Sequence, residues 1–167
     1  MKRGILILFS IICLMMNSFS ACSSEFNAKE CIASNLDINT DSAQVNTVIN
    51  SSRNFHGDGH TFISLGFADN PITDEIKQKE NWKQLPLTDN LTSLVYGKEN
   101  VYNGITNDDD ELLIPQIENG YYYFENRHSD AKNRYGDSDV FDLVSYNYTI
   151  AIYDEDENIL YFYSLDT

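Results

Sequence analysis

The sequence predicts a small α+β domain: an antiparallel sheet of four to five strands with two short helices on one of its faces. Two observations carry this prediction. Residues 145–153 and 159–165 alternate between apolar and polar side chains around an acidic turn, and the pattern changes to a helical one between residues 71 and 97. The elements are expected in the order (β)βααβββ. A chain of 167 residues has room for one such domain.

The N-terminus has the pattern of a bacterial export signal. Lys2 and Arg3 form a basic start, and residues 4–16 are an apolar run that only Ser10 interrupts. The run is shorter than the roughly 20 apolar residues that a membrane-spanning helix needs. We therefore expect residues 1–21 to be a signal peptide and the protein to be exported.

The signal ends in Phe19-Ser20-Ala21-Cys22, which resembles the bacterial lipobox. In that motif, small residues precede a cysteine whose thiol receives a diacylglycerol before cleavage. The resemblance implies that Cys22 is the lipidation site, which would anchor the protein to the outer face of the cell membrane. Phe19 stands where the motif usually has an aliphatic residue. Conventional cleavage after Ser20 is the alternative and would release a secreted protein.

The segment after the signal is expected to be a tether. Residues 22–43 are rich in Ser, Asn, Asp and Thr and show no sustained period, which is typical of a flexible linker. The folded domain is then residues 44–167. Cys13 leaves with the signal and Cys22 is acylated, so Cys31 remains alone; without lipidation, Cys22 and Cys31 could instead form a short disulfide.

The first half of the domain begins with strands. Val45, Val48 and Ile49 indicate a short strand near residue 44. Residues 61–68 alternate, with Ile63 on one face and Phe62 on the other, and therefore predict a second strand.

Two helices are expected next. Pro71 suits a first helical turn and acidic residues follow it, so a helix is expected toward Trp82. Residues 84–87 are expected to be an extended link, because Pro86 disfavours helix at the preceding residue. Thr88 is a suitable N-cap and Gly97 a suitable C′ residue for a second helix over 89–96.

Three further strands complete the expected fold. Residues 120–126 include three consecutive tyrosines, Tyr121 to Tyr123, and predict a strand. The alternating segments 145–153 and 159–165 flank the acidic turn and predict a hairpin.

Several of these segments together are similar to a set of short, uncharacterised, predicted lipoproteins of Gram-positive, clostridia-like bacteria. The resemblance covers about residues 54–167, where it rests on 55–59, 82–87, 96–97, 114–115, 119–124, 127–129 and the C-terminal stretch from 153. It implies export and one domain, and it carries no assigned activity.

The net charge restricts the class of partner. The chain has 26 acidic residues against 11 basic ones and a formal charge of −15, which argues against nucleic acid and anionic membrane surfaces, since both are polyanions. Removal of Lys2 and Arg3 makes the exported part more acidic still. A basic protein or peptide, or a glycan, at the cell surface is compatible with this charge.

The strongest candidate for chemistry is His56-Gly57-Asp58-Gly59-His60. An extended backbone would place His56, Asp58 and His60 on one side, and imidazole and carboxylate are ligands for zinc and related metals. If the strands from Thr61 and up to Asn126 are antiparallel neighbours, His128 lies at the same sheet end. The alternative is a glycine-rich turn whose histidines are solvated.

Most of the tyrosines lie in the C-terminal part of the chain. On an exposed sheet face they would form a platform for a protein, peptide or glycan, with Tyr121, Tyr123 and Arg127 as candidate ligand-binding residues. As strand formers they would instead fill half-buried cross-strand positions. The leading hypothesis is a lipid-anchored, non-enzymatic binding domain without a cofactor. The alternative is a metal-binding protein or metal-dependent hydrolase built on His56, Asp58, His60 and His128.

Overall fold

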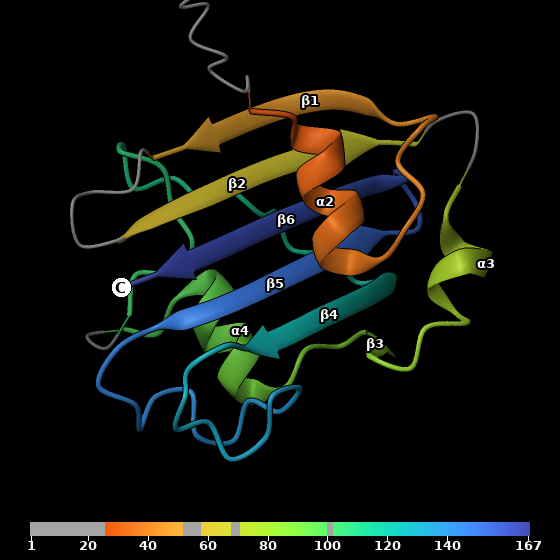
Figure 1. Ribbon diagram of the computed structural model, residues 1–167. Helices are drawn as coiled ribbons and strands as arrows, with labels where there is room; N and C mark the ends of the chain where they lie inside the picture. The colour runs from red at the N-terminus through yellow and green to blue at the C-terminus, as the bar shows by residue number, and fades with distance from the viewer. Residues whose placement is uncertain (1–25, 52–57, 68–70, 100–101) are drawn as a thin grey trace, which may run out of the picture.

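The computed structural model describes residues 26–51, 58–67, 71–99 and 102–167, and one antiparallel sheet lies at its centre (Figure 1). The sheet has six strands in the order β1-β2-β6-β5-β4-β3. The strands are β1 (Gln44–Asn50), β2 (Gly59–Gly66), β3 (Trp82–Gln84), β4 (Gly120–Asn126), β5 (Asn147–Asp154) and β6 (Ile159–Asp166). The helices are α2 (Ala28–Leu36), α3 (Thr73–Ile76) and α4 (Asp89–Tyr96). The predicted α+β class is confirmed, but the sheet has more strands than the four to five expected.

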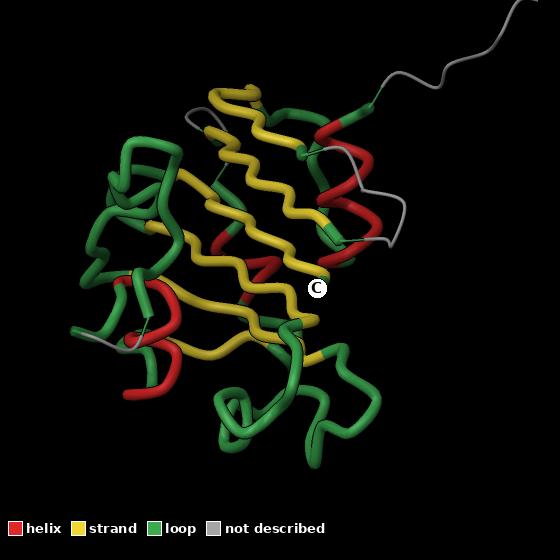
Figure 2. Tube along the Cα trace, turned by 90° about the vertical axis from the view of Figure 1, so that its left-hand side faces the viewer, coloured by secondary structure: helices red, strands yellow, loops and turns green. Residues whose placement is uncertain are grey.

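The sheet is covered on both faces. Figure 2 shows the strands between α2 on one side and α4 on the other. On the α2 side, Ile32 and Leu36 pack with Ile63 and Phe162 of the sheet. On the α4 side, the buried side chains of the helix join a second cluster with the opposite faces of the same strands, which comprises Phe62, Leu91, Leu94, Val95, Ile150, Ile152 and Tyr163.

The expectation that two helices pack on one face is wrong. Ile76 of α3 joins the cluster on the α2 side, whereas Leu91 and Leu94 of α4 lie on the other side. The physical reason is the composition of the central strands: in β5, Ile150 and Ile152 face α4, while Ala151 faces α2, and all three are fully buried. A sheet that is apolar on both faces requires cover on both.

The predicted tether is largely folded, which corrects the expected domain boundary at residue 44. Within residues 22–43, α2 begins after Asn27, whose side chain accepts a hydrogen bond from the backbone N–H of Glu30 at 3.3 Å. Three apolar residues four positions apart, Ala28, Ile32 and Leu36, are buried against the sheet. This stripe is sufficient to dock a helix although the segment is polar overall.

The first predicted helix is much shorter than expected. α3 spans only Thr73–Ile76, because Ile76 is its one buried side chain and the residues from Lys77 to Asn81 offer no apolar contact for a further turn. Trp82, expected at the end of that helix, instead begins β3 and pairs with Tyr123 of β4.

The remaining elements agree with the local signals. Thr88 caps α4 by accepting a hydrogen bond from the N–H of Leu91 at 3.2 Å, and Gly97 follows with a φ of 88°. β4 has the predicted bounds, and β5 and β6 form the predicted hairpin. The termini of β2, β4, β5 and β6 bring several polar residues to one end of the sheet, where the candidate site lies.

Candidate functional site

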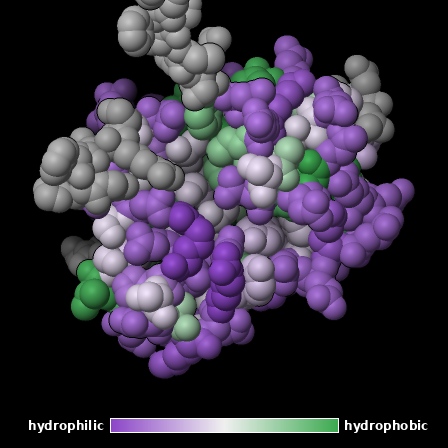
Figure 3. Space-filling view, in the orientation of Figure 1, coloured by the Kyte–Doolittle hydropathy of each residue, from purple (hydrophilic) through white to green (hydrophobic). Residues whose placement is uncertain are grey.

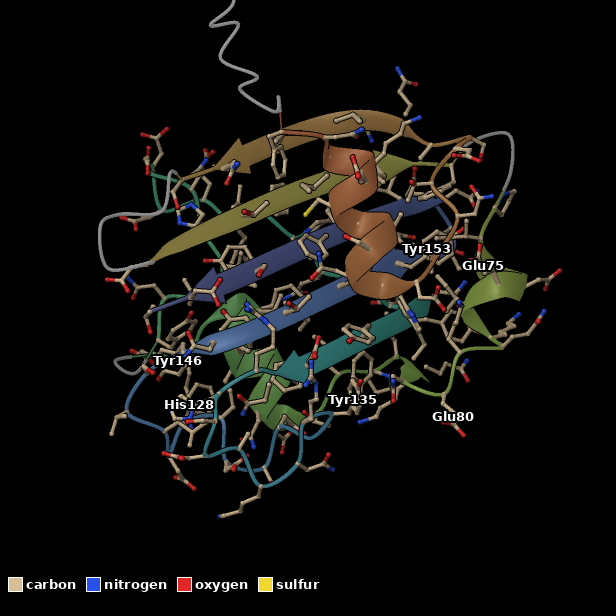
Figure 4. All side chains as sticks on the ribbon, in the orientation of Figure 1. Glu75, Glu80, His128, Tyr135, Tyr146 and Tyr153 are labelled. Atoms are coloured by element: carbon tan, nitrogen blue, oxygen red, sulfur yellow. The ribbon has the colours of Figure 1, made fainter. Side chains whose placement is uncertain are left out.

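The histidines grouped with Asp58 in the sequence do not form a cluster in the described residues. His60 lies in β2 and His128 follows β4, at the same end of the sheet as predicted, but β6 and β5 lie between these strands. Neighbouring strands are about 4.8 Å apart, so the two positions are separated by about 14 Å. Figure 4 shows His128 near the ends of β4 and β5. His56 lies outside the described residues.

Each described histidine has a local structural contact. The His60 ring stacks on Tyr163 with 5.9 Å between ring centroids. Nδ1 of His128 accepts a hydrogen bond from the backbone N–H of Asp130 at 3.1 Å. In the parts of the chain that the structure describes, no three His, Cys, Asp or Glu side chains are grouped to hold a metal ion. The metal hypothesis therefore has no geometric support from these residues.

The tyrosines do not form an exposed platform. All eleven lie in the described residues, and each is buried or half-buried. Tyr148 and Tyr153, for example, are at most 1% exposed. The interpretation of the tyrosines as fillers of cross-strand positions therefore accounts for their placement.

Two of the three predicted ligand-binding residues, Tyr121 and Tyr123, lie on the α2 side of β4. The ring of Tyr121 is 5.6 Å from the Lys77 ammonium. Tyr123 is buried between Trp82 and Tyr135, with ring-centroid distances of 5.9 and 6.1 Å. Trp82, Tyr123 and Tyr135 line a groove of about 540 Å³ between the end of α2 and β3, on the side where Figure 4 labels Tyr135.

Several ionisable groups around this aromatic groove bind one another. The Tyr123 hydroxyl donates to Glu125 at 3.0 Å, and Arg134 forms an ion pair with the same carboxylate. Burial and this hydrogen bond raise the pKa of Tyr123. Lys79 pairs with Asp37 at 2.6 Å. These internal pairs engage Lys79, Asp37 and the Tyr123 hydroxyl within the protein.

A row of five polar side chains crosses the α2 side of the sheet next to the apolar core. Register pairs each of them directly with the next, from β1 through β2, β6 and β5 to β4, so all five lie on one face. The members of this polar row are Asn50, Thr61, Ser164, Thr149 and Glu125.

Arg127, the third predicted ligand-binding residue, lies across this polar row. It follows β4, and its guanidinium reaches over β5 to β6. Nη1 forms an ion pair with Asp166 at 2.6 Å. Nη2 donates to the Ser164 hydroxyl at 2.9 Å and to the backbone carbonyls of Tyr148 and Leu165 at 3.0 and 3.1 Å. These contacts hold the guanidinium in place. The side chain is about a quarter exposed.

A cavity of about 350 Å³ lies between α2 and the polar row; we call it the Arg127 cavity. Asn50, Thr61 and Ser164 of the row line it, together with Arg127. Its other walls come from the α2 region and from the neighbouring strand positions, namely Phe26, Cys31, Asn35, Ser51 and Phe162. The chain thus places hydroxyl and amide groups beside aromatic rings at one end of the sheet.

In the part of the chain that the structure describes, buried polar atoms without a partner gather at this end, and Nδ2 of Asn126 at the end of β4 is one of them. The hydroxyl of Thr149, which is fully buried, and Nε of Arg127 make no hydrogen bond within the described residues. Figure 3 shows that the surface on this side of the molecule is mostly hydrophilic, with small separate hydrophobic patches. The Arg127 cavity sets polar groups beside the rings of Phe26 and Phe162 in this face.

No family model, curated protein or solved structure matches this chain. Among the residues that the structure describes, no helix combines the length and the hydrophobicity needed to cross a bilayer. The chemistry of the Arg127 cavity is therefore the basis for assigning a function.

The described lining residues of the cavity include one nucleophilic group, the thiol of Cys31. Cys31 is half-buried, and burial raises the pKa of its thiol, which keeps it in the unreactive protonated form at neutral pH. No histidine or carboxylate is among the described residues that line the cavity, so these residues supply no general base.

Sequence reasoning identified Arg127 but missed the polar row. A signal that could have found it is a polar residue two positions from a buried one, on the same face of successive strands. Glu125 stands two residues after Tyr123 in β4, Thr149 two residues before Ala151 in β5, and Ser164 two residues after Phe162 in β6. Only the register shows that these polar residues align.

Proposed function

We propose that the protein is a lipid-anchored, extracytoplasmic domain that binds a small polar ligand in the Arg127 cavity without catalysing a reaction. The export pattern of residues 1–21 and the lipobox-like Cys22 support the location. The observation that carries the binding function is that three members of the polar row, Asn50, Thr61 and Ser164, line the cavity beside Arg127.

One member of the polar row, Thr149, has a cost for folding, and this cost supports a functional role for the row. An apolar residue at the fully buried Thr149 would pack without leaving a hydroxyl unpaired, and an unpaired buried polar group costs about 1–3 kcal/mol. Proteins break hydrophobic patterning most often at functional sites. A cavity of about 350 Å³ lies at the small end of ligand pockets, which span about 300–1,000 Å³.

The anchor is tested by metabolic labelling with palmitate. The full chain should incorporate the label and fractionate with membranes, whereas Cys22→Ala should lose both properties. Cys31→Ala is the matched control, because it removes the other cysteine of the exported part and should keep the label. A Cys22→Ala protein that still carries label would rule out lipidation at this position.

The binding site is tested by the thermal stability of the full chain in detergent against a panel of neutral sugars, free amino acids and dipeptides. At least one class should raise the melting temperature of the wild type. Thr61→Val, which removes a hydroxyl from the cavity wall, should weaken this effect. Thr47→Val is the matched control, since Thr47 is exposed on the other face of the neighbouring strand. If no class stabilises the wild type, the proposed function is wrong.

A further inference from the structure

We infer that the ligand of the Arg127 cavity is an uncharged sugar of one or two rings; this inference rests on the proposed function. The first step is the charge of the cavity. Arg127 brings the one cationic group among its described lining residues, and Asp166 neutralises it through the 2.6 Å ion pair. Both Nη atoms are therefore engaged by the protein, and Nε, which has no partner among the described residues, is buried. The guanidinium is poorly placed to clamp a ligand carboxylate.

The charge of the whole chain points the same way. With a formal charge of −15, the protein repels anions at long range. A zwitterionic amino acid would need a free cation for its carboxylate and a free anion for its ammonium group, and neither stands among the described lining residues. An uncharged ligand is not repelled by the net charge and needs no charged partner in the cavity.

The polar groups of the cavity match hydroxyl groups. Ser51, Thr61 and Ser164 present hydroxyls, and Asn35 and Asn50 present amides. Hydroxyl and amide side chains both donate and accept hydrogen bonds, as sugar hydroxyls do. Each of these groups already makes a hydrogen bond within the protein. Each also keeps donor or acceptor capacity that a sugar hydroxyl can use and an apolar ligand cannot.

Two aromatic side chains complete the fit. Phe26 is 42% exposed just ahead of α2, and the fully buried Phe162 lies in the wall formed by β6. A sugar ring has a face of C–H groups and an edge of hydroxyls, so it can contact an aromatic ring while its edge meets the polar row. The volume of about 350 Å³ limits the occupant to a small ligand.

The test measures binding of glucose, galactose, N-acetylglucosamine and their β-linked disaccharides to the full chain in detergent, by ligand-observed NMR and calorimetry. Glucuronate and galacturonate are the matched charged probes, and alanine and alanyl-alanine represent amino acids and peptides. We expect a neutral sugar to bind at least tenfold more tightly than the corresponding uronate. Phe26→Ala and Thr61→Val should each weaken binding about tenfold, and Thr47→Val should leave it unchanged.

Cys31 gives an independent readout of where the sugar binds. Because Cys31 lines the cavity, a bound neutral sugar should slow its alkylation by iodoacetamide severalfold at pH 9. Binding of alanine or alanyl-alanine alone, sensitive to Thr61→Val, would overturn the sugar class and keep the proposed function. Sugar binding that neither protects Cys31 nor responds to the variants would show that the sugar binds outside the Arg127 cavity. Absence of binding by every probe would overturn both the proposed function and the sugar class.

Discussion

Arg127 connects three strands through a single side chain. Its guanidinium joins the end of β4 to backbone carbonyls of β5 and β6 and to the carboxylate of Asp166. Both members of the ion pair are less than one third exposed, so solvent screens their interaction less than it would at an open surface. The residue therefore stabilises the same sheet end that it equips for binding.

Replacement of Arg127 by methionine keeps much of the volume and removes the charge. We expect Arg127→Met to lower the free energy of unfolding by about 2–3 kcal/mol, because Asp166 and the two carbonyls lose a charged donor. Urea denaturation followed by circular dichroism measures this loss, with the exposed Lys132→Met as control. Equal stability of the two variants would show that the Arg127 contacts contribute nothing.

Buried tyrosines make stability depend on pH at the alkaline end. Burial raises the pKa of Tyr148 and Tyr163 in the folded protein, whereas tyrosine in an unfolded chain titrates near pH 10. The neutral form is favoured in the fold, so this contribution is complete below about pH 10 and is lost as the pH rises toward the folded pKa.

The expected result is cooperative alkaline unfolding. Tyrosinate absorbance near 295 nm and the far-ultraviolet circular dichroism should change together above about pH 10. Titration of all eleven tyrosines near pH 10 with unchanged circular dichroism would contradict the burial of Tyr148 and Tyr163.

Among the elements, α2 differs most from its prediction, because a segment expected to be a flexible tether forms a helix packed on the sheet. Ile32 is fully buried between this helix and the sheet. We expect Ile32→Ala to lower the free energy of unfolding by about 2–4 kcal/mol, as is usual for a large core side chain cut to alanine. Denaturant unfolding of the full chain measures the change.

Val144→Ala is the control for this truncation. Val144 is 96% exposed, so the loss of its methyl groups should change stability by at most about 0.5 kcal/mol. If Ile32→Ala were as mild as the control, residues 28–36 would behave as the tether that the composition suggested.

The elements that the sequence predicted well are those set by local chemistry. α4 has a side-chain cap at Thr88, a glycine at its end and apolar residues at helical spacing, and each of these signals lies within the segment itself. α2 was missed because its apolar stripe of three residues is embedded in a polar composition. β3 was missed because three residues are too few to show a period.

The candidate site could be predicted only in part, because it depends on contacts between distant residues. The sequence drew attention to Arg127, but its hydrogen bond to Ser164 joins residues 37 positions apart. The polar row requires the register of five strands. The predicted convergence of histidines failed for the same reason, since it assumed that β2 and β4 are neighbours, whereas β6 and β5 separate them.

For the whole molecule, charge sets a measurable dependence on ionic strength. The excess of acidic residues, 26 against 11 basic, makes the compact state repel itself, and salt screens this repulsion. We expect an increase from about 0.05 to 0.5 M sodium chloride to raise the free energy of unfolding by about 1 kcal/mol, which corresponds to a few degrees in melting temperature. Potassium chloride should act equally, and a falling melting temperature in both salts would contradict self-repulsion.

The early start of α2 also fixes how far the domain can stand from its anchor. Phe26 lies only four positions after Cys22, and an extended chain covers at most about 3.5 Å per residue, so about 14 Å is the greatest separation of these two residues. With Cys22 acylated as proposed, the Phe26 wall of the cavity is held close to the lipid headgroups. A ligand would then enter from the narrow layer beside the bilayer, where a longer tether would have allowed approach from any direction.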